Sequence, residues 1–423
     1  MNKGCIPTKT LLRSAEIMRY LKRAQEFGLS AKEIGFDMAR IIARKDAVVR
    51  RSVENDAFRR MLHEHGIPLL EAEATFLSPH EVGVDGRVIR AERLVVATGS
   101  VPAVPPVPGL AETGYITSDE ALDLTTLPES ILIVGAGAVG LEFAEFYAPF
   151  GTRVTVIEML HRVLPQEDEE VSEALQAYLE EEGIEVHTRT KLVRVSREGE
   201  DKVALAETPE GTRTFRAREI LVATGRRPIT RGLGLEKAGV ELGRGRVVAV
   251  DSELRTSREH IFAAGDVAGG YLFTHKAVYE GEIAVHNALS SVAQEADYAA
   301  VPRVTFTEPQ VGSVGLTEAQ ARERGLQVRV GKAHLKHMGK GPAIGETQGF
   351  VKLVVDDKSG KLLGWHIVSH LANEVIMEGV VAIMAGLTVM DLSAAIHPHP
   401  TIPEMVKAAA KSLVEGPGKL SCC

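Results

Sequence analysis

Hydrophobic residues follow three successive patterns along the chain. Residues 10–64 carry apolar groups at roughly helical spacing in a polar background, which predicts long helices. After Gly66 the apolar runs become short and alternate with turn residues, a pattern typical of strands. Residues 301–423 combine both patterns, with a strand predicted over 349–355 and a helix over 374–385. These patterns predict a mixed α/β protein built of three parts.

One short segment occurs twice in nearly the same form. Residues 91–99 read AERLVVATG, and residues 217–225 read AREILVATG. An internal repeat of this kind predicts two related α/β halves in tandem. The proline-rich residues 101–109 are predicted to link them.

A glycine-rich turn follows a predicted buried strand in the downstream half. The apolar run 131–134 leads directly into GAGAVG and then into a helical stretch. In this strand–turn–helix context, glycines allow a tight turn, close approach of a pyrophosphate and close helix packing. The phosphates then face the N-terminus of the helix. We therefore predict that Gly135, Gly137 and Gly140 bind a dinucleotide.

An acidic residue follows the next predicted strand. Residues 153–157 form this strand, and Glu158 comes 18 residues after Gly140. A carboxylate here accepts hydrogen bonds from a ribose 2′-hydroxyl and repels a 2′-phosphate. Glu158 therefore favours NAD(H) slightly over NADP(H), although the nearby Arg162 weakens that preference.

Charge and cysteine content exclude several classes of protein. The chain has 49 Lys and Arg against 57 Asp and Glu, a net charge of −8. This balance argues against nucleic acid and anionic membrane surfaces as partners. Neither a membrane-spanning apolar run nor a secretory signal after Met1 is found in the sequence. Three cysteines do not make a secreted disulfide scaffold, so a cytoplasmic location is expected.

The first cysteine stands where a helix is predicted to begin. Pro7 suits the first turn of a helix, and residues 10–18 continue it. A helix N-terminus favours the thiolate form of Cys5, which makes it a candidate nucleophile and redox centre. The alternative is a small buried hydrophobic residue.

Five ordered segments together resemble the pyridine nucleotide-disulfide oxidoreductases, a family that includes dihydrolipoyl dehydrogenase, glutathione reductase and mercury(II) reductase. They are GCIPTK at 4–9, the two Ala-Thr-Gly segments, GAGAVG at 135–140 and IFAAGD at 261–266. The resemblance covers essentially the whole chain. It implies two Rossmann-like domains, for FAD and NAD(P), and a C-terminal α+β dimerisation domain. It also implies that the functional unit is a homodimer.

The resemblance predicts the domain boundaries. The FAD-binding domain is expected over 1–113 and 236–300, and the NAD(P)-binding domain over 114–235. The dimerisation domain is expected over 301–423.

Two family features are expected upstream of Met1. Gly135 precedes Thr224 by 89 residues, whereas the position 89 residues before Thr98 is Lys9, where no glycine triplet occurs. Cys5 matches the second cysteine of the family's C-x₄-C pair, whose first member would precede Met1. We therefore expect an N-terminally truncated chain that holds little FAD and cannot form the active-site disulfide. The alternative is an upstream half that has lost its phosphate cradle.

The resemblance also assigns cofactor contacts to particular residues. Asp266 matches the acid that binds the ribitol and diphosphate region of FAD. The segment beginning at Thr274 matches a helix start facing the pyrimidine edge of the flavin, where amides and the helix dipole stabilise negative charge. The full set of predicted FAD and repeat-segment contacts is Thr98, Gly99, Gly225, Gly265, Asp266, Thr274 and His275.

Catalytic roles follow from the same resemblance. Lys9 and Glu142 match an ion pair beside the flavin N5, where a buried charge needs a partner. His399 and Glu404 match the family's acid/base dyad, which serves the cysteines of the partner subunit. Imidazole exchanges protons near pH 7, and a carboxylate fixes its tautomer.

The substrate is predicted from the end of the chain. Cys422 and Cys423 resemble the vicinal cysteine pair of mercury(II) reductases, and with Cys5 they would bind Hg(II), a soft metal. An accidental or oxidised pair is the alternative. Residues 305–311 also look closest to the mercury enzymes, whereas His399 and Glu158 follow the dihydrolipoyl dehydrogenase pattern. We predict an FAD-dependent NAD(P)H oxidoreductase that reduces Hg(II) presented as a thiol complex. Dihydrolipoyl dehydrogenase and a catalytically silent, dimerising fragment are the alternatives.

Overall fold

The computed structural model describes residues 3–54 and 57–416. Contacts divide the chain into two compact units. The smaller unit comprises Arg50–Ala103 and Gly225–Tyr298. The larger unit comprises Asn2–Val49, Val104–Thr224 and Ala299–Cys423. Each unit is described by itself below.

The first part of the larger unit is helical. It contains α1 (Cys5–Lys22), the 3₁₀ turn η1 (Ala24–Phe27) and α2 (Met38–Glu54), whose last residues belong to the smaller unit. Leu11, Ala15 and Met18 recur at helical spacing on α1, and all three are buried in one core cluster. Through this apolar side α1 packs against α6 (Ala138–Tyr147).

A four-stranded parallel sheet forms the second part of the larger unit, in the order β12–β6–β7–β8. Every residue of β6 is buried, as expected for a strand inside a covered parallel sheet. Beside this sheet lies an antiparallel sheet, β11–β10–β9. The elements, apart from α6, are α4 (Leu110–Thr113), α5 (Ser118–Ala121), β6 (Ser130–Val134), η2 (Ala148–Phe150), β7 (Arg153–Ile157), α7 (Glu169–Glu181), β8 (Glu185–His187), β9 (Lys191–Glu198), β10 (Asp201–Thr208), β11 (Gly211–Ala217) and β12 (Glu219–Val222).

The third part of the larger unit is a five-stranded antiparallel sheet, in the order β15–β16–β19–β18–β17. Its elements are β15 (Arg303–Thr305), β16 (Gln310–Gly315), α10 (Glu318–Glu323), β17 (Val328–His334), η5 (Leu335–His337), α11 (Lys340–Ile344), β18 (Phe350–Asp356), β19 (Leu362–Ser369), α12 (Ala372–Met384), α13 (Val389–Ala394) and α14 (Glu404–Val414).

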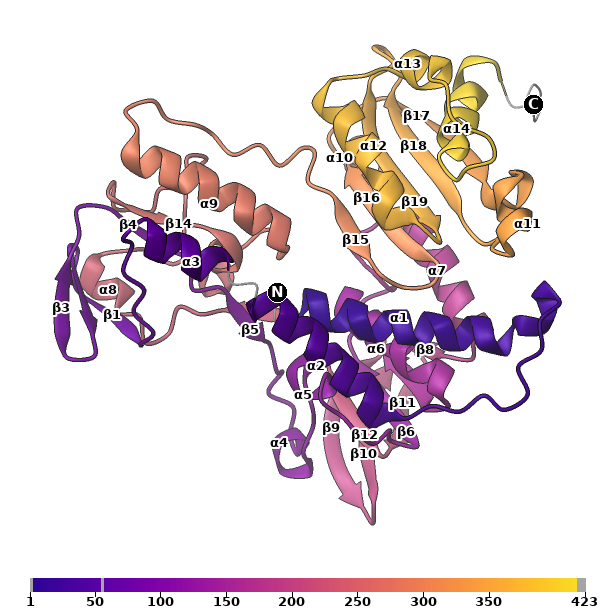
Figure 1. The fold of residues 1–423 in the computed structure, drawn as a ribbon, viewed down its shortest axis with the longest axis horizontal. Coiled ribbons are helices and arrows are strands. Elements are labelled where there is room, and N and C mark those ends of the chain that lie inside the picture. Colours follow the sequence, from indigo (N-terminus) through magenta and orange to yellow (C-terminus); the bar gives the residue numbers. More distant parts are fainter. Residues whose placement is uncertain (1–2, 55–56, 417–423) are drawn as a thin grey trace. The chain divides into compact units, whose positions relative to one another are not determined.

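Two helices cover one face of this sheet (Figure 1). Trp365 pairs with Leu353, and Leu353 pairs with Gly331, so the three residues share a face. Helix α12 approaches Trp365 through Gly379, where an added Cβ would lie 2.8 Å from the indole ring. Helix α14 approaches Gly331 through Ala409, whose carbonyl oxygen would lie 2.4 Å from an added Cβ. Glycine is required at both positions because the helices lie so close.

The smaller unit contains three small sheets. Strands β1, β2 and β3 form an antiparallel meander, β4 pairs with β14 in parallel, and β5 pairs with β13 antiparallel. The elements are α3 (Ala57–Glu64), β1 (Ala74–Ser78), β2 (Glu81–Val84), β3 (Arg87–Arg90), β4 (Leu94–Val96), β5 (Ser100–Pro102), β13 (Arg226–Pro228), α8 (Leu235–Ala238), η3 (Arg244–Arg246), β14 (Ile261–Ala263), η4 (Gly265–Ala268) and α9 (Thr274–Leu289).

The mixed α/β class predicted from the sequence is confirmed, and most predicted elements agree with the structure. The strand predicted over 153–157 is β7, and the strand and helix predicted over 349–355 and 374–385 are β18 and α12, each shifted by one or two residues. The helix predicted over 10–18 begins earlier, at Cys5. The predicted linker 101–109 begins as strand β5, because its first residues pair with β13. The bounds of the four predicted domain segments stay a prediction. Among the described residues, the structure has no helix that meets the length and hydropathy needed to span a bilayer.

Candidate functional site

The predicted dinucleotide turn joins β6 to α6, and its backbone requires glycine. Gly135 has φ +110°, and a Cβ there would lie 2.5 Å from the carbonyl oxygen of Ala223. A Cβ on Gly140 would lie 2.0 Å from the carbonyl oxygen of Gly135. Gly137 differs, because a Cβ there would meet no atom within 4 Å. The first and third glycines close the turn, and the second leaves its outer surface open for a pyrophosphate.

Glu158 lies directly after β7 and is turned toward this glycine motif. One carboxylate oxygen accepts a hydrogen bond from the amide of Ala136 at 2.8 Å, and the other accepts one from the amide of Leu160 at 2.8 Å. Each oxygen keeps a lone pair for a further donor such as a ribose hydroxyl. The carboxylate is therefore fixed before any nucleotide arrives.

Cys5 is the first residue of α1 and is exposed. The preceding Gly4 provides no side-chain cap for the helix. The sequence predicted that the thiol lies just before the helix, whereas in the structure Cys5 is the first helical residue.

Lys9 and Glu142 are 133 residues apart and form an ion pair. The Nζ atom of Lys9 lies 2.8 and 2.9 Å from the two carboxylate oxygens of Glu142, and 4.4 Å from the centre of the Phe306 ring. Glu142 is 4% exposed and also accepts a hydrogen bond from the amide of Phe306 at 3.1 Å. The family resemblance indicated this pair, whereas no sequence pattern indicated the contacts with Phe306.

His399 and Glu404 also contact each other. The Nδ1 atom of His399 lies 2.9 Å from the carboxylate of Glu404, which also accepts a hydrogen bond from the amide of Thr401 at 2.7 Å. Burial alone would raise the pKa of Glu404, but the Thr401 amide and His399 lower it below its ordinary value. The imidazole is 67% exposed, so its Nε2 side can receive a substrate or another chain.

The predicted FAD residues lie in the smaller unit. Asp266 follows β14 and contacts the hydroxyl of Ser100, and Arg226 lies 3.8 Å from its carboxylate. Gly265 has φ +79°, and a Cβ there would come within 3.2 Å of the Cβ of Ala277 on α9. Close packing of α9 on this turn, with a carboxylate beside it, suits the ribitol and diphosphate end of FAD.

The other predicted cofactor contacts flank this turn in sequence or in space. Gly99 has φ +71° and Gly225 has φ +105°, which favours glycine at both sites. Thr98 donates its hydroxyl to the carbonyl of Ile229 at 2.7 Å. Helix α9 begins at Thr274 as predicted, and the ring of His275 stacks on Phe273 with centroids 5.2 Å apart. These residues fit FAD at one end of the cofactor, and no glycine-rich phosphate turn accompanies them in the described part of the smaller unit. Cys422 and Cys423 lie outside the described residues.

Sequence reasoning did not foresee a polar cluster beside a cavity of about 240 Å³ in the larger unit. The Nδ1 atom of His370 lies 3.2 Å from both carboxylate oxygens of Glu308, and Glu16 lies close to both residues. Burial raises the pKa of Glu308 despite His370, and the hydrogen bond to Glu308 raises the pKa of His370. Burial also raises the pKa of the neighbouring Tyr20 to about 12. Glu308 belongs to the segment 305–311 that the resemblance singled out, but its pairing with His370 needed the fold.

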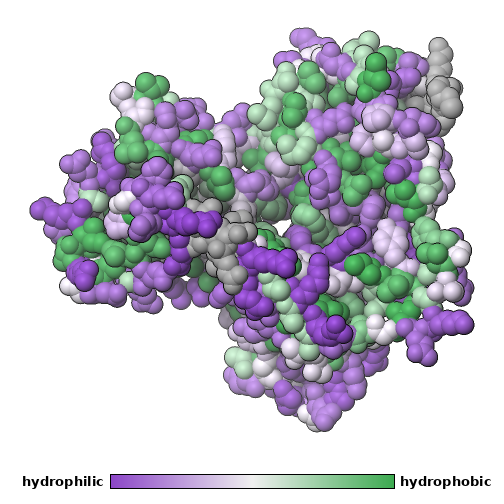
Figure 2. Space-filling model, viewed as in Figure 1, coloured by the Kyte–Doolittle hydropathy of each residue, from purple (hydrophilic) through white to green (hydrophobic). Residues whose placement is uncertain are grey.

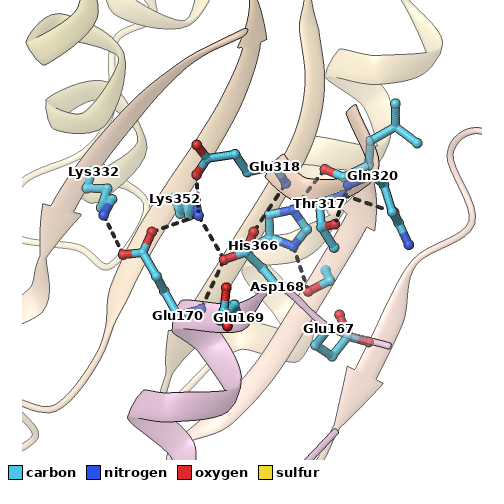
Figure 3. Close-up of polar contacts among 12 residues, drawn as sticks. Glu167, Asp168, Glu169, Glu170, Thr317, Glu318, Gln320, Lys332, Lys352 and His366 are labelled. Carbon is cyan, nitrogen blue, oxygen red and sulfur yellow. Dashed lines mark hydrogen bonds and ion pairs between the residues drawn. The ribbon is translucent and has the colours of Figure 1, made fainter. Parts of the chain in front are cut away.

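A second unforeseen cluster surrounds Lys352 on β18 (Figure 3). Its ammonium group lies 2.8 Å from Asp168, 2.7 Å from Glu170 and 2.9 Å from Glu318. Burial alone would lower the pKa of Lys352, but the hydrogen bonds to these carboxylates raise it above its ordinary value. For the three acids, burial would raise the pKa, yet Lys352 and the other donors lower it.

We expect Lys352→Met to lower the free energy of unfolding at pH 7 by about 3–5 kcal/mol, because it leaves the buried carboxylate of Asp168 without its cation. The pKa values of Asp168, Glu170 and Glu318 are lowered by folding, so the stability they contribute is lost as pH falls through their folded-state pKa values. The difference between wild type and variant should therefore shrink as pH is lowered below about 4, where the variant's carboxylates become protonated. Urea unfolding across pH measures it.

Lys332→Met is the matched control. Lys332 is 38% exposed and pairs with Glu170 at the edge of the same cluster. Its loss should cost less than about 1 kcal/mol, since exposed ion pairs contribute little. Equal effects of the two substitutions would contradict the expected role of Lys352.

Comparison with known proteins gives the family. Residues 1–281 match the family described as pyridine nucleotide-disulphide oxidoreductase, and residues 301–410 match its dimerisation domain. The chain is 39% identical to a mercuric reductase of Streptomyces lividans, over 100% of this chain and 90% of that protein. It is 40% identical to a dihydrolipoyl dehydrogenase of Chlorobaculum tepidum, over 99% of this chain and 90% of that protein.

A solved structure has the same fold. The HOCl-induced flavoprotein disulfide reductase RclA of Escherichia coli superposes with a TM-score of 0.84, at 28% identity, over 97% of this chain and 90% of that one. The chain therefore belongs to the pyridine nucleotide-disulfide oxidoreductases, a family of flavoprotein enzymes that use FAD and NAD(P)H. The predicted fold, two dinucleotide-binding domains and a dimerisation domain, is confirmed.

Proposed function

We propose that this protein is an NAD(P)H-dependent mercury(II) reductase. The observation that carries the proposal is the vicinal pair Cys422–Cys423, added to Cys5, in a chain with no other cysteine. Thiolates are the ligands that soft metal ions prefer, so all three sulfur atoms suit Hg(II) as a substrate. The similarity to a mercuric reductase over nearly the whole chain supports this choice.

The chain's own residues divide the work. The turn at Gly135–Gly140 and Glu158 bind the nicotinamide nucleotide, with NADH used at least as well as NADPH because of the Glu158 carboxylate. FAD, when bound, supplies the group that accepts a hydride equivalent and passes on two electrons, which reduce Hg(II) to Hg(0). Cys5 binds the metal through its exposed sulfur at the start of α1. Lys9 and Glu142 neutralise each other in a buried position that the resemblance places beside the flavin.

Dihydrolipoyl dehydrogenase is the second candidate, and the dyad His399–Glu404 favours it. The carboxylate holds Nδ1 at 2.9 Å, which leaves Nε2 to remove a proton from a dithiol. The similarity to a dihydrolipoyl dehydrogenase supports this reading to the same degree. The cysteine pair is the reason we favour Hg(II) over a dithiol as the substrate.

A homodimer is part of the proposal. The dimerisation domain carries apolar side chains on the outer side of α12, where Met377, Val381 and Met384 are 51%, 57% and 75% exposed. Hydrophobic side chains (green) are visible at the surface of this part of the chain in Figure 2. Exposed apolar side chains aligned on one helix are typical of a protein interface. A second subunit there would bring its own thiols to the exposed His399, as the resemblance implies.

The test replaces Cys422 and Cys423 together by alanine in the flavin-loaded enzyme. Turnover of Hg(II) presented as a thiol complex should fall by about tenfold or more, because ligand exchange needs an attacking thiolate. Reduction of the flavin by NADH, followed by absorbance in a stopped-flow instrument, should not change. The assay is Hg(II)-dependent oxidation of NADH.

Oxidation of dihydrolipoamide by the same variant provides the control, and it should match wild type. A wild-type enzyme that oxidises dihydrolipoamide rapidly and reduces Hg(II) negligibly would show that the second candidate is correct. A variant with unchanged Hg(II) turnover would remove the observation on which the proposal depends.

A further inference from the structure

A row of polar residues crosses one face of the five-stranded sheet. Each strand contributes one member, and neighbours in the row are cross-strand partners. Cross-strand partners point to the same face of a sheet, so the row lies opposite the face that α12 and α14 cover. In strand order the members are Arg303, Ser313, His366, Lys352 and Lys332.

The cations of this row bind the segment that leads into α7 and the first turn of that helix. Figure 3 shows the contacts of Lys352 and Lys332. Arg303 donates two parallel hydrogen bonds to Glu167, at 2.9 and 3.1 Å. Lys352 binds Asp168, which also caps α7 by accepting a hydrogen bond from the amide of Glu170. Arg303 and Glu167 are 4% and 8% exposed, so these charges are held away from water. Breaking such a pair leaves a buried charge without a partner.

The same segment begins at Glu158, the carboxylate proposed to bind the nucleotide. Residues 158–168 run from Glu158 to Asp168, and between them the amide of Leu164 donates to the carbonyl of Ala136 in the glycine turn at 2.9 Å. Leu164 is buried and has φ +40°, an uncommon conformation that needs support from its surroundings. The segment is therefore fixed at both ends, by the glycine turn and by the polar row.

Arg162 lies within this segment and contacts its far end. Its Nη2 atom lies 3.3 Å from the carbonyl oxygen of Pro165 and 3.4 Å from that of Glu167, and Glu169 lies 3.8 Å from its guanidinium. A guanidinium near Glu158 would attract a 2′-phosphate. Here Arg162 binds the carbonyl oxygens of Pro165 and Glu167 instead, and Arg303 binds the side chain of Glu167.

We propose that Arg303 and Lys352, residues of the dimerisation domain, are positioning residues for nucleotide selection. They anchor Glu167 and Asp168 and thereby fix segment 158–168. The fixed segment keeps Glu158 at the ribose and holds Arg162 against Pro165 and Glu167. This inference rests on the proposed role of Glu158 in nucleotide binding. It assigns discrimination between NADH and NADPH to contacts made on a different domain. Misplacing a binding group by about 1 Å is enough to change affinity strongly.

The test measures NADH and NADPH dissociation constants of the purified 423-residue protein by fluorescence titration. Arg303→Lys keeps the charge but cannot form the two parallel hydrogen bonds, and Glu167→Gln keeps the shape but removes the charge. Each variant should bind NADH about tenfold more weakly, and the ratio of its NADPH to NADH dissociation constants should fall about fivefold or more below the wild-type ratio. Adding Arg162→Ala to Arg303→Lys should restore the preference without restoring the affinity. A purely structural role would weaken both nucleotides alike and leave the ratio unchanged.

Arg329→Lys is the matched control, because Arg329 forms an exposed ion pair with Asp357 at 2.7 Å on β17. It should leave both dissociation constants within about twofold of wild type. If Arg303→Lys does not fold cooperatively, Glu167→Gln decides. If a folded Arg303→Lys or Glu167→Gln variant binds both nucleotides as wild type does, with an unchanged ratio of dissociation constants, this inference is wrong. The proposed dinucleotide site would not be affected by that result. A wild type that binds neither nucleotide overturns the proposed dinucleotide site, and this inference with it.

Discussion

Replacing Cys5 by serine is expected to reduce thiol-dependent turnover of the flavin-loaded enzyme by about 10³-fold or more, as removal of a nucleophile does in other enzymes. The thiol is exposed at the first position of α1. A serine hydroxyl is a far weaker acid and does not bind soft metals, so neither Hg(II) nor a dithiol substrate has its partner. Steady-state oxidation of NADH with each substrate measures the loss.

The control is binding of the nicotinamide nucleotide. It should be unchanged, because the predicted nucleotide site consists of the glycine turn and Glu158 and does not include Cys5. Ser14, on the same helix, gives a second control: Ser14→Ala should preserve turnover with both substrates. A Cys5→Ser enzyme that keeps a tenth or so of wild-type turnover would show that another group takes the electrons.

His399→Ala is expected to lower dihydrolipoamide oxidation by about 10²–10⁴-fold, the usual contribution of a general acid or base. The imidazole is held by Glu404 through Nδ1, which leaves Nε2 as the proton acceptor. Hg(II) reduction should fall much less, because a metal bound by thiolates has no proton to lose. The ratio of the two activities in the variant, compared with wild type, measures the effect.

Glu404→Gln separates orientation from proton transfer. The amide can still contact Nδ1 and orient the ring but carries no charge, so we expect a smaller loss than in His399→Ala. His397 is the matched control on the same loop, since its ring contacts Glu378 instead, at 3.0 Å. Equal loss of both activities in His399→Ala would indicate that the dyad serves the fold of this loop and not a dithiol substrate.

The sequence alone predicted those features that neighbouring residues determine together. The strand, the glycine turn, the helix and Glu158 follow one another within 131–158, so local sterics and charge identify them. The same is true of the α/β class and of the helix start at Cys5, whose position was wrong by a few residues because helix ends depend on capping. The pairs Lys9–Glu142 and His399–Glu404 came from the resemblance, and their distances needed the structure.

Only the tertiary structure revealed the polar row and its partners. Lys352 stands in the sequence as one charge inside an apolar strand, which signals a buried partner but does not name it. Arg303, Lys352 and the acids Glu167 and Asp168 are far apart in the chain, and they meet because strand register places the cations in one line across the sheet. Register is set by pairing between distant strands, and a shift of one residue would turn the whole row to the other face. The sequence therefore determined the nucleotide turn itself, whereas the fold decided what holds its neighbouring segment in place.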